Sequence, residues 1–186
     1  MSKQVWKPGT MVYPLQAVMV SCGDMEKSNI ITVAWTGTIC TDPAMVYISV
    51  RPERYSYNMI KETGEFVINL TTKELARKTD FAGVKSGRDL DKFDKLKLTK
   101  EKASKVKAPL IKESPVNIEC KVTEIKELGT HHMFIAKVLA VDVDEKYLDE
   151  KGKFCLEKAN LITYSHGEYY EQGKNIGKFG FSVKKK

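Results

Sequence analysis

Two arginines and a serine directly follow a strongly apolar segment. The segment MVYISV (45–50) runs into RPERYS, which places Arg51, Arg54 and Ser56 where a helix can begin. The first N–H groups of a helix have no backbone partners, and the helix dipole favours an anion there. Arginine can also bind a phosphate through two parallel hydrogen bonds. These residues indicate a site for a phosphate-bearing ligand; a helix cap with surface arginines is the alternative.

The segment NIITVAWTG offers groups that suit a planar ligand. Asn29 and Thr32 place small polar side chains on a predicted strand, and Trp35 could lie beside a flat ring. Thr36 and Gly37 would let backbone groups approach that ring closely. The alternative for Trp35 is a place in the hydrophobic core.

A lysine and a histidine pair are further candidates. Lys92 in SGRDLDKF (86–93) could reach an anionic group, or it could be solvated like most loop lysines. His131 and His132 are adjacent on a predicted strand and point to opposite faces, so they are not expected to bind one metal together. One histidine is expected to face a pocket, and a structural hydrogen bond is the alternative.

No hydrolytic or metal-binding motif is present in the sequence. It contains no GxSxG, HExxH or strand–GxGxxG–helix unit. The four cysteines are too scattered for a metal site, and we expect reduced thiols, mostly in the core. They are Cys22, Cys40, Cys120 and Cys155. Ligand-binding groups without a nucleophile are typical of proteins whose cofactor carries the reaction.

Strands are expected to dominate the fold, which is mainly β with a few short helices. Helices are predicted over 56–63, with Ser56 as N-cap and Gly64 as C′ residue, and over 72–82 from a Thr71/Glu74 capping box. Residues 83–115 are polar and lack a clean hydrophobic period, so we predict a long irregular segment there. Alternation in VNIECKV predicts a half-buried strand with Asn117, Glu119 and Lys121 facing outward. The predicted strands are 18–23, 31–35, 45–50, 65–70, 116–122 and 133–144, with a loop between 35 and 45. An antiparallel barrel over one domain, 1–186, fits best.

The net charge of +7 is concentrated in one region. Residues 85–113 carry ten Lys and Arg against five Asp and Glu, without aromatic residues among the lysines beyond Lys95. A nucleic-acid partner is therefore not expected. The sequence has no apolar run of about 18 residues and no secretory signal, so we expect a cytoplasmic protein without membrane association.

The ordered motifs resemble the flavin reductase-like family, most closely its flavoredoxin branch. They are AWTG (34–37), DP (42–43), ISVRPERYSYNMI, TGEFVINL, SGRDLDKF, ELGTHHMFIAKV and GKNIGKFGF, which together cover almost the whole chain. The resemblance implies an FMN-binding split β-barrel of Greek-key type and usually a homodimer. It also implies electron transfer through FMN from NADH, NADPH or a protein donor to an acceptor.

The resemblance also assigns roles to individual residues. The flavin ring or ribityl chain would be lined by Asn29, Thr32, Trp35, Thr36 and Gly37. The phosphate end would be held by Arg51, Arg54, Tyr55, Ser56 and Lys92. His131 would approach the flavin and, if positively charged, would stabilise its reduced form; Tyr164 would be an aromatic neighbour. No catalytic side chain and no metal are expected.

Two alternatives remain open from the sequence. The chain could be a flavin- or haem-binding module of the same barrel without turnover of its own. If it is an electron-transfer protein, its lysine-rich region could dock an acidic redox protein.

Overall fold

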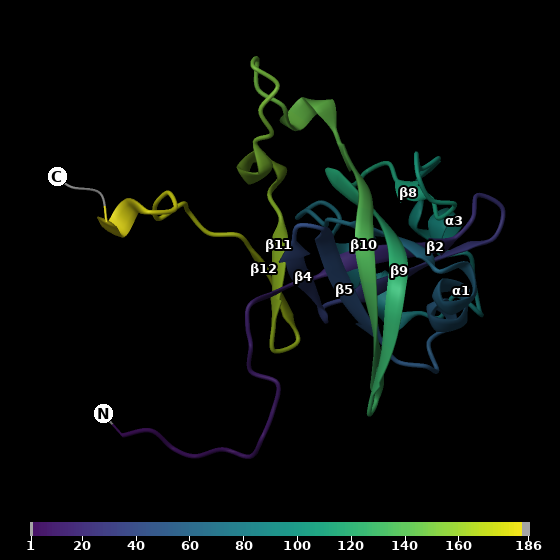
Figure 1. The fold of residues 1–186 in the computed structure, drawn as a ribbon, viewed down its shortest axis with the longest axis horizontal. Helices are drawn as coiled ribbons and strands as arrows, with labels where there is room; N and C mark the ends of the chain where they lie inside the picture. Colours follow the sequence, from purple (N-terminus) through teal and green to yellow (C-terminus); the bar gives the residue numbers. More distant parts are fainter. Residues whose placement is uncertain (1, 184–186) are drawn as a thin grey trace.

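A computed structural model describes residues 2–183 of the chain. Figure 1 shows a body built around strongly curved strands, with both chain ends reaching away from it. The strands are β1 (Leu15–Gln16), β2 (Val18–Gly23), β3 (Ser28–Val33), β4 (Thr36–Thr41), β5 (Ala44–Val50), β6 (Glu65–Asn69), β7 (Lys100–Glu101), β8 (Leu110–Ile111), β9 (Val116–Leu128), β10 (His131–Val143), β11 (Ile162–Ser165) and β12 (Glu168–Glu171). The helices are α1 (Tyr55–Thr63), α2 (Ala76–Val84) and α3 (Lys92–Leu96), with 3₁₀ turns η1 (Glu145–Tyr147), η2 (Leu156–Ala159) and η3 (Phe181–Val183).

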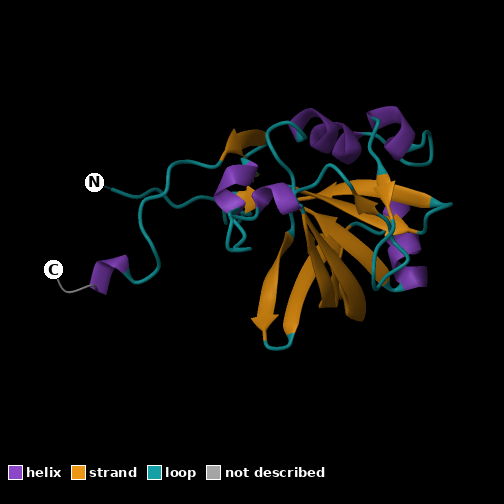
Figure 2. Ribbon diagram, turned by 90° about the horizontal axis from the view of Figure 1, so that it is seen from above, coloured by secondary structure: helices purple, strands orange, loops and turns teal. Residues whose placement is uncertain are grey.

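Seven antiparallel strands form the main sheet. Their order is β3-β2-β6-β9-β10-β5-β4, and a small sheet β1-β11-β12 stands beside it. The long β9–β10 hairpin carries the curvature, with register shifts near Ala136 and Ala140. Figure 2 shows the helices around the outside of the strands. The prediction of a mainly β barrel with brief helices is confirmed.

The core lies on the concave side of the main sheet. Alternate residues of β2, β5, β6 and β10 meet there, including Val20, Ile48, Phe66 and Phe134, which are fully buried. Cys22, Cys120 and Cys155 are buried and Cys40 is half-buried, so the prediction that the thiols lie mostly in the core is confirmed.

The predicted loop between 35 and 45 was wrong. It holds β4, which pairs with β5 down to the Thr41–Ala44 pair, so that Asp42 and Pro43 form a two-residue hairpin turn. The sequence TGTICT gave no apolar signal because most of its side chains are exposed or only half-buried at the sheet edge.

The helix ends also differ from the prediction. α1 ends as predicted, with Gly64 in the left-handed region at φ 64°. Its N-cap is Arg54, however, and Ser56 lies buried inside the first turn. α2 begins at Ala76 and not at residue 72, because the Thr71 hydroxyl donates to the carbonyl of Ala17 and caps no helix.

A buried carboxylate holds part of the irregular segment after α2 in place. The Glu119 side chain is fully buried, although the sequence placed it on an outward face. Its oxygens accept hydrogen bonds from the N–H groups of Ser104, Lys105 and Val106 at 2.8, 2.6 and 3.0 Å. Burial raises the pKa of Glu119, but these hydrogen bonds outweigh burial and hold the pKa below its usual range.

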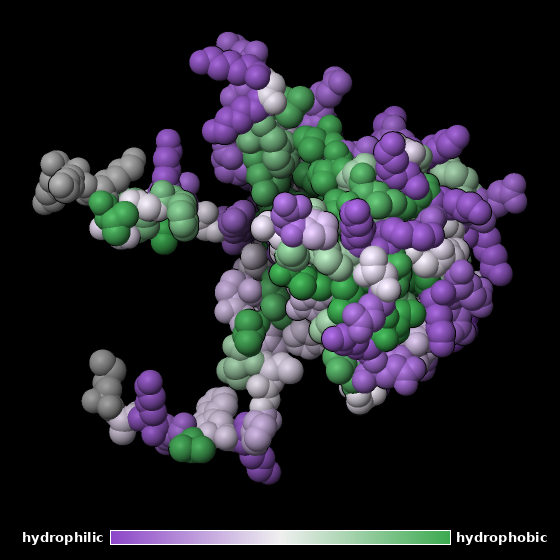
Figure 3. All heavy atoms as spheres, in the orientation of Figure 1, coloured by the Kyte–Doolittle hydropathy of each residue, from purple (hydrophilic) through white to green (hydrophobic). Residues whose placement is uncertain are grey.

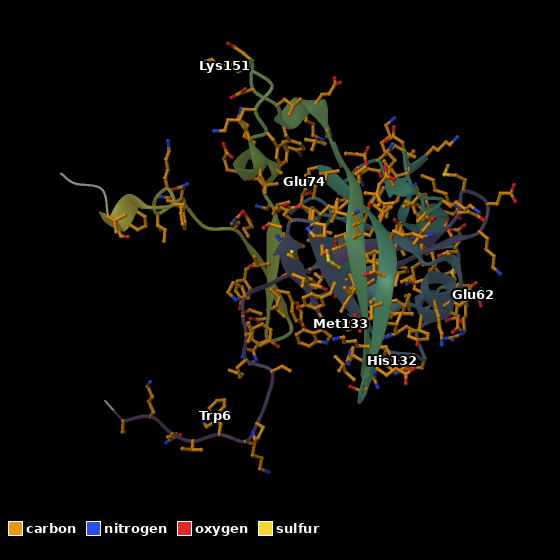
Figure 4. All side chains as sticks on the ribbon, viewed as in Figure 1. Trp6, Glu62, Glu74, His132, Met133 and Lys151 are labelled. Atoms are coloured by element: carbon orange, nitrogen blue, oxygen red, sulfur yellow. The ribbon has the colours of Figure 1, made fainter. Side chains whose placement is uncertain are left out.

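Both chain ends form arms that leave the body on the same side. Figure 3 shows hydrophobic side chains on these arms, and Figure 4 places Trp6 on the N-terminal arm, away from the sheet. The exposed apolar residues include Val5, Trp6 and Val12 on one arm and Ile176, Phe179, Phe181 and Val183 on the other. Among residues 2–183, no helix has the length and apolar character needed to cross a membrane.

Candidate flavin-binding cleft

One cleft collects most of the residues that the sequence singled out. Two adjoining cavities of about 220 and 280 Å³ share Ile31, Arg54 and Gly83, so they form a continuous depression. The first cavity lies at the start of α1, between β3, α2 and the segment before α3; we call it the phosphate end. The second lies between β3, the end of β5, the start of β10 and the small sheet; we call it the ring end.

The phosphate end is built on the first turn of α1. Arg54, Tyr55 and Ser56 line it, and no side chain caps the helix there. The Asn29 amide donates to the Ser56 hydroxyl oxygen at 2.8 Å, and both residues are buried. The Ser56 hydroxyl also forms a hydrogen bond with the Cys22 thiol behind it. This combination of helix N-terminus, hydroxyl and cation is the donor set that a phosphate requires.

Lys92 belongs to α3 and lies below the same end of the cleft. It is only 3% exposed, and its Nζ donates to the carbonyls of Ile30 and Ala82, both at 2.7 Å. Burial, together with the positive charge of Arg54, lowers the pKa of Lys92 to about 8. The prediction that Lys92 lies in a loop was therefore wrong, because Lys92 is buried in helix α3 beside the cleft.

Gly87 and Arg88 belong to the phosphate end but were not chosen from the sequence. A Cβ on Gly87 would lie 2.2 Å from the Asn29 Oδ1 and 2.8 Å from the Tyr55 ring. Arg88 holds its guanidinium 5.7 Å from the centre of the Tyr55 ring and donates to the Glu53 carbonyl. Both residues belong to the motif SGRDLDKF, and its Gly-Arg pair could have identified them from the sequence.

The ring end presents a wider, partly aromatic surface. Thr32, Trp35, Arg51, His131 and Tyr164 all line it. Trp35 is half-buried and faces the cleft, so its alternative place in the core is excluded. The Thr32 hydroxyl donates to the carbonyl of Thr79, which ties β3 to α2 across the floor of the cleft.

Tyr169 also lines the ring end and was missed by the sequence reasoning. Its ring packs edge-on against Tyr164 at 5.6 Å, and its hydroxyl donates to the Asp80 carboxylate at 3.3 Å. Burial and the Asp80 charge raise the pKa of Tyr169 to about 12. The small sheet therefore forms an aromatic wall tied to α2.

Thr36 and Gly37 lie outside the cleft, contrary to their predicted place beside the ring. Both are on β4, and the Thr36 hydroxyl donates to the Tyr47 carbonyl at 2.7 Å. A Cβ on Gly37 would lie 3.0 Å from the Tyr47 ring, so this glycine accommodates Tyr47.

The two histidines point to opposite faces, as predicted. His131 lines the ring end, whereas the Nδ1 of His132 lies 2.8 Å from the Tyr57 hydroxyl oxygen. Figure 4 shows His132 near the hairpin end of β10. Burial and the charge of Arg51 lower the pKa of His131, which disfavours its charged form. Arg51 and Arg54 also bring positive charge to this part of the cleft.

The cleft provides binding groups and no activated nucleophile. Cys22 contacts the Asn29 carbonyl behind the phosphate end, and burial raises the pKa of its thiol to about 11. A thiol with this pKa carries no useful thiolate at pH 7. The arrangement suits an elongated ligand with an anion at one end and a planar ring at the other. The missing Cβ of Gly87 leaves room for the Asn29 and Tyr55 side chains that line the phosphate end.

Comparison with known proteins identifies the family of this chain. The family model described as "Flavin reductase like domain" matches residues 10–172. The structure of flavoredoxin from Desulfovibrio vulgaris (Miyazaki F) superposes with a TM-score of 0.89 and 32% identity, covering 98% of this chain and 99% of that one.

Two archaeal relatives come from Archaeoglobus fulgidus. An uncharacterised protein is 36% identical over 165 residues, which are 89% of this chain and 88% of the relative. A ferric-chelate reductase (NAD(P)H) is 25% identical over 137 residues, 73% of each chain. The chain therefore belongs to the flavin reductase-like family, with a split-barrel fold close to that of flavoredoxin.

Proposed function

We propose that the chain binds FMN in the cleft and acts as an oxidoreductase that passes electrons from NAD(P)H or a protein donor to an acceptor. The observation that carries this proposal is the joining of an anion-binding helix start to an aromatic ring end in one depression. When bound, FMN supplies the redox chemistry, because it can take up and release one or two electrons.

Each end of the cleft has a defined task in this proposal. The first turn of α1, Ser56 and Lys92 would bind the phosphate and fix the cofactor along the cleft. Trp35 and Tyr164 would lie beside the ring and exclude part of the water. Arg51 and Arg54 supply positive charge, which favours the reduced, more negative form of the ring.

Visible absorption under anaerobic conditions tests the proposal. The purified protein, loaded with FMN, is titrated with NADH and then NADPH. Bleaching of the flavin bands by either nucleotide is expected for a reductase. Bands that bleach only with a chemical reductant or a reduced redox protein identify a carrier fed by a protein. A protein that quenches no flavin fluorescence on titration with FMN contradicts FMN binding, and bound flavin that transfers no electrons to any donor or acceptor indicates the non-catalytic module.

We further propose that two copies of the chain associate through the arms. Val5 is fully exposed and Ile176 is 90% exposed, which is unusual for apolar residues in an isolated protein. A second copy covering both arms would remove this surface from water. Light scattering of the full chain and of a variant lacking the residues before Tyr13 tests it; a monomeric full chain would contradict the proposal.

A protein donor, where one is used, is proposed to be acidic. The carboxylates in the lysine-rich region are engaged in local hydrogen bonds: Asp91 accepts from the N–H of Phe93 at 2.8 Å, and Glu113 accepts from the N–H of Thr99 at 3.0 Å. Residues 85–113 carry ten Lys and Arg against five Asp and Glu, which leaves this region with an excess of positive charge. The rate of reduction by such a donor should fall steeply as salt is raised, and a rate independent of ionic strength would exclude electrostatic docking.

A further inference from the structure

A hollow of about 430 Å³ lies beside the cleft, along α2. It shares Tyr169 with the ring end and Lys85 with the phosphate end. The last turn of α2 is therefore a ridge with the cleft on one side and the hollow on the other. A molecule lying in the hollow needs to pass only Tyr169 to reach the ring end. The hollow is lined by Ala76, Arg77, Asp80, Phe81, Val84, Lys85 and Tyr169.

The charge in the hollow is unbalanced toward the positive. Asp80 lies three residues after Arg77 on α2, a spacing at which side chains often form an ion pair. The Asp80 carboxylate instead accepts a hydrogen bond from the Tyr169 hydroxyl at 3.3 Å. Within residues 2–183, neither Arg77 nor Lys85 forms an ion pair. Both cations are exposed and available to an anionic ligand.

The rest of the hollow is apolar and partly aromatic. Phe81 is half-buried, and Val84 leaves 69% of its surface in water. Tyr169 is held in place by its contacts with Asp80 and Tyr164. An exposed valine beside two aromatic rings offers a surface for a planar base. The volume also lies within the range of small-ligand sites.

We propose that this hollow binds the adenosine end of NADPH, with Arg77 as the residue that recognises its 2′-phosphate. The inference rests on the proposed function and deepens it, because it selects the donor. A dinucleotide seated there extends over Tyr169, so that its nicotinamide reaches the ring end. A donor bound in this way would supply a hydride, one proton with two electrons, to the flavin and would leave as NADP⁺. Arginine suits a phosphate dianion because its guanidinium binds two oxygens at once.

Binding of nucleotide fragments to the FMN-loaded protein tests the proposal without turnover. Adenosine 2′,5′-bisphosphate and 5′-AMP are titrated by calorimetry into wild type, Arg77→Gln and Lys78→Gln. Lys78 is a matched control because it lies on the same helix and its loss removes the same charge, yet its Nζ donates to the Lys97 carbonyl and lies outside the hollow. A flavin absorption spectrum of each sample reports cofactor retention separately.

Wild type should bind the 2′,5′-bisphosphate at least about tenfold more tightly than 5′-AMP. Arg77→Gln should remove that preference, and Lys78→Gln should keep it. Equal affinities for the two nucleotides in wild type, an unchanged preference in Arg77→Gln or an equal loss in both variants would overturn the proposal. If flavin is retained in such an experiment, only the inference about the donor fails. If no sample holds flavin, the proposed function itself fails.

Discussion

Affinity for FMN should depend on pH through Lys92. This lysine lies at the phosphate end with a pKa of about 8, lowered by burial and by Arg54. A phosphate dianion placed beside it favours the charged lysine and raises that pKa again. FMN binding above pH 8 must therefore take up a proton, so affinity falls as the pH rises. Below about pH 7 the lysine is already charged and affinity is level.

The size of the effect follows from the same pKa. With a pKa of about 8, roughly nine-tenths of the free protein carries charged Lys92 at pH 7 and roughly one-tenth at pH 9. If the bound state keeps the lysine charged throughout, the Kd for FMN rises about tenfold between these values, equivalent to about 1.4 kcal/mol. The phosphate does not contribute, because a phosphate monoester with a second pKa near 6 is already a dianion.

Quenching of flavin fluorescence by apoprotein at pH 7, 8 and 9 measures this dependence. Riboflavin is the matched ligand control, because it lacks the phosphate and should show little change. Lys92→Arg is the matched protein control, since arginine remains charged over this range and should give a level profile. His131 and Cys22 do not interfere, because the pKa of His131 is lowered and that of Cys22 lies at about 11. A wild-type Kd for FMN that is constant from pH 7 to 9 would refute the reasoning.

Three further changes test other parts of the structure. Gly87→Ala places a Cβ 2.2 Å from Asn29 and should weaken FMN binding by about tenfold or more, whereas Gly173→Ala, with nothing within 4 Å, should leave the fluorescence titration unchanged. In Glu119→Gln, the amide NH₂ replaces one carboxylate oxygen and faces backbone N–H groups that need an acceptor. The free energy of unfolding measured in urea should therefore fall by about 3 kcal/mol. The control Glu124→Gln, on the exposed part of β9, should lower it by less than about 1 kcal/mol. His131→Ala removes a ring whose charged form is disfavoured and should leave the flavin midpoint potential nearly unchanged at pH 7, and a clear drop would show that His131 is charged there.

Local chemistry was sufficient to predict most of the strands and the anion site. Apolar runs such as VMVSCG and EFVINL became β2 and β6 because their side chains are buried on both faces. Arg54 and Ser56 lie at the start of α1, as RPERYS indicated. The order of motifs along the chain indicated the family, which the comparisons then showed.

Only the tertiary structure decided which faces are covered and which residues meet. Glu119 was read as outward-facing because alternation records polarity along one strand, not the N–H groups that a distant loop brings to it. Lys92 is buried because α3 packs against β3, and no local sequence pattern predicts that contact. Thr36 and Gly37 fall outside the cleft because both face Tyr47 of β5: the Thr36 hydroxyl donates to the Tyr47 carbonyl, and Gly37 packs against the Tyr47 ring. Tyr169 reaches Asp80 across 89 residues, so its place at the ring end depends on long-range packing that periodicity does not encode.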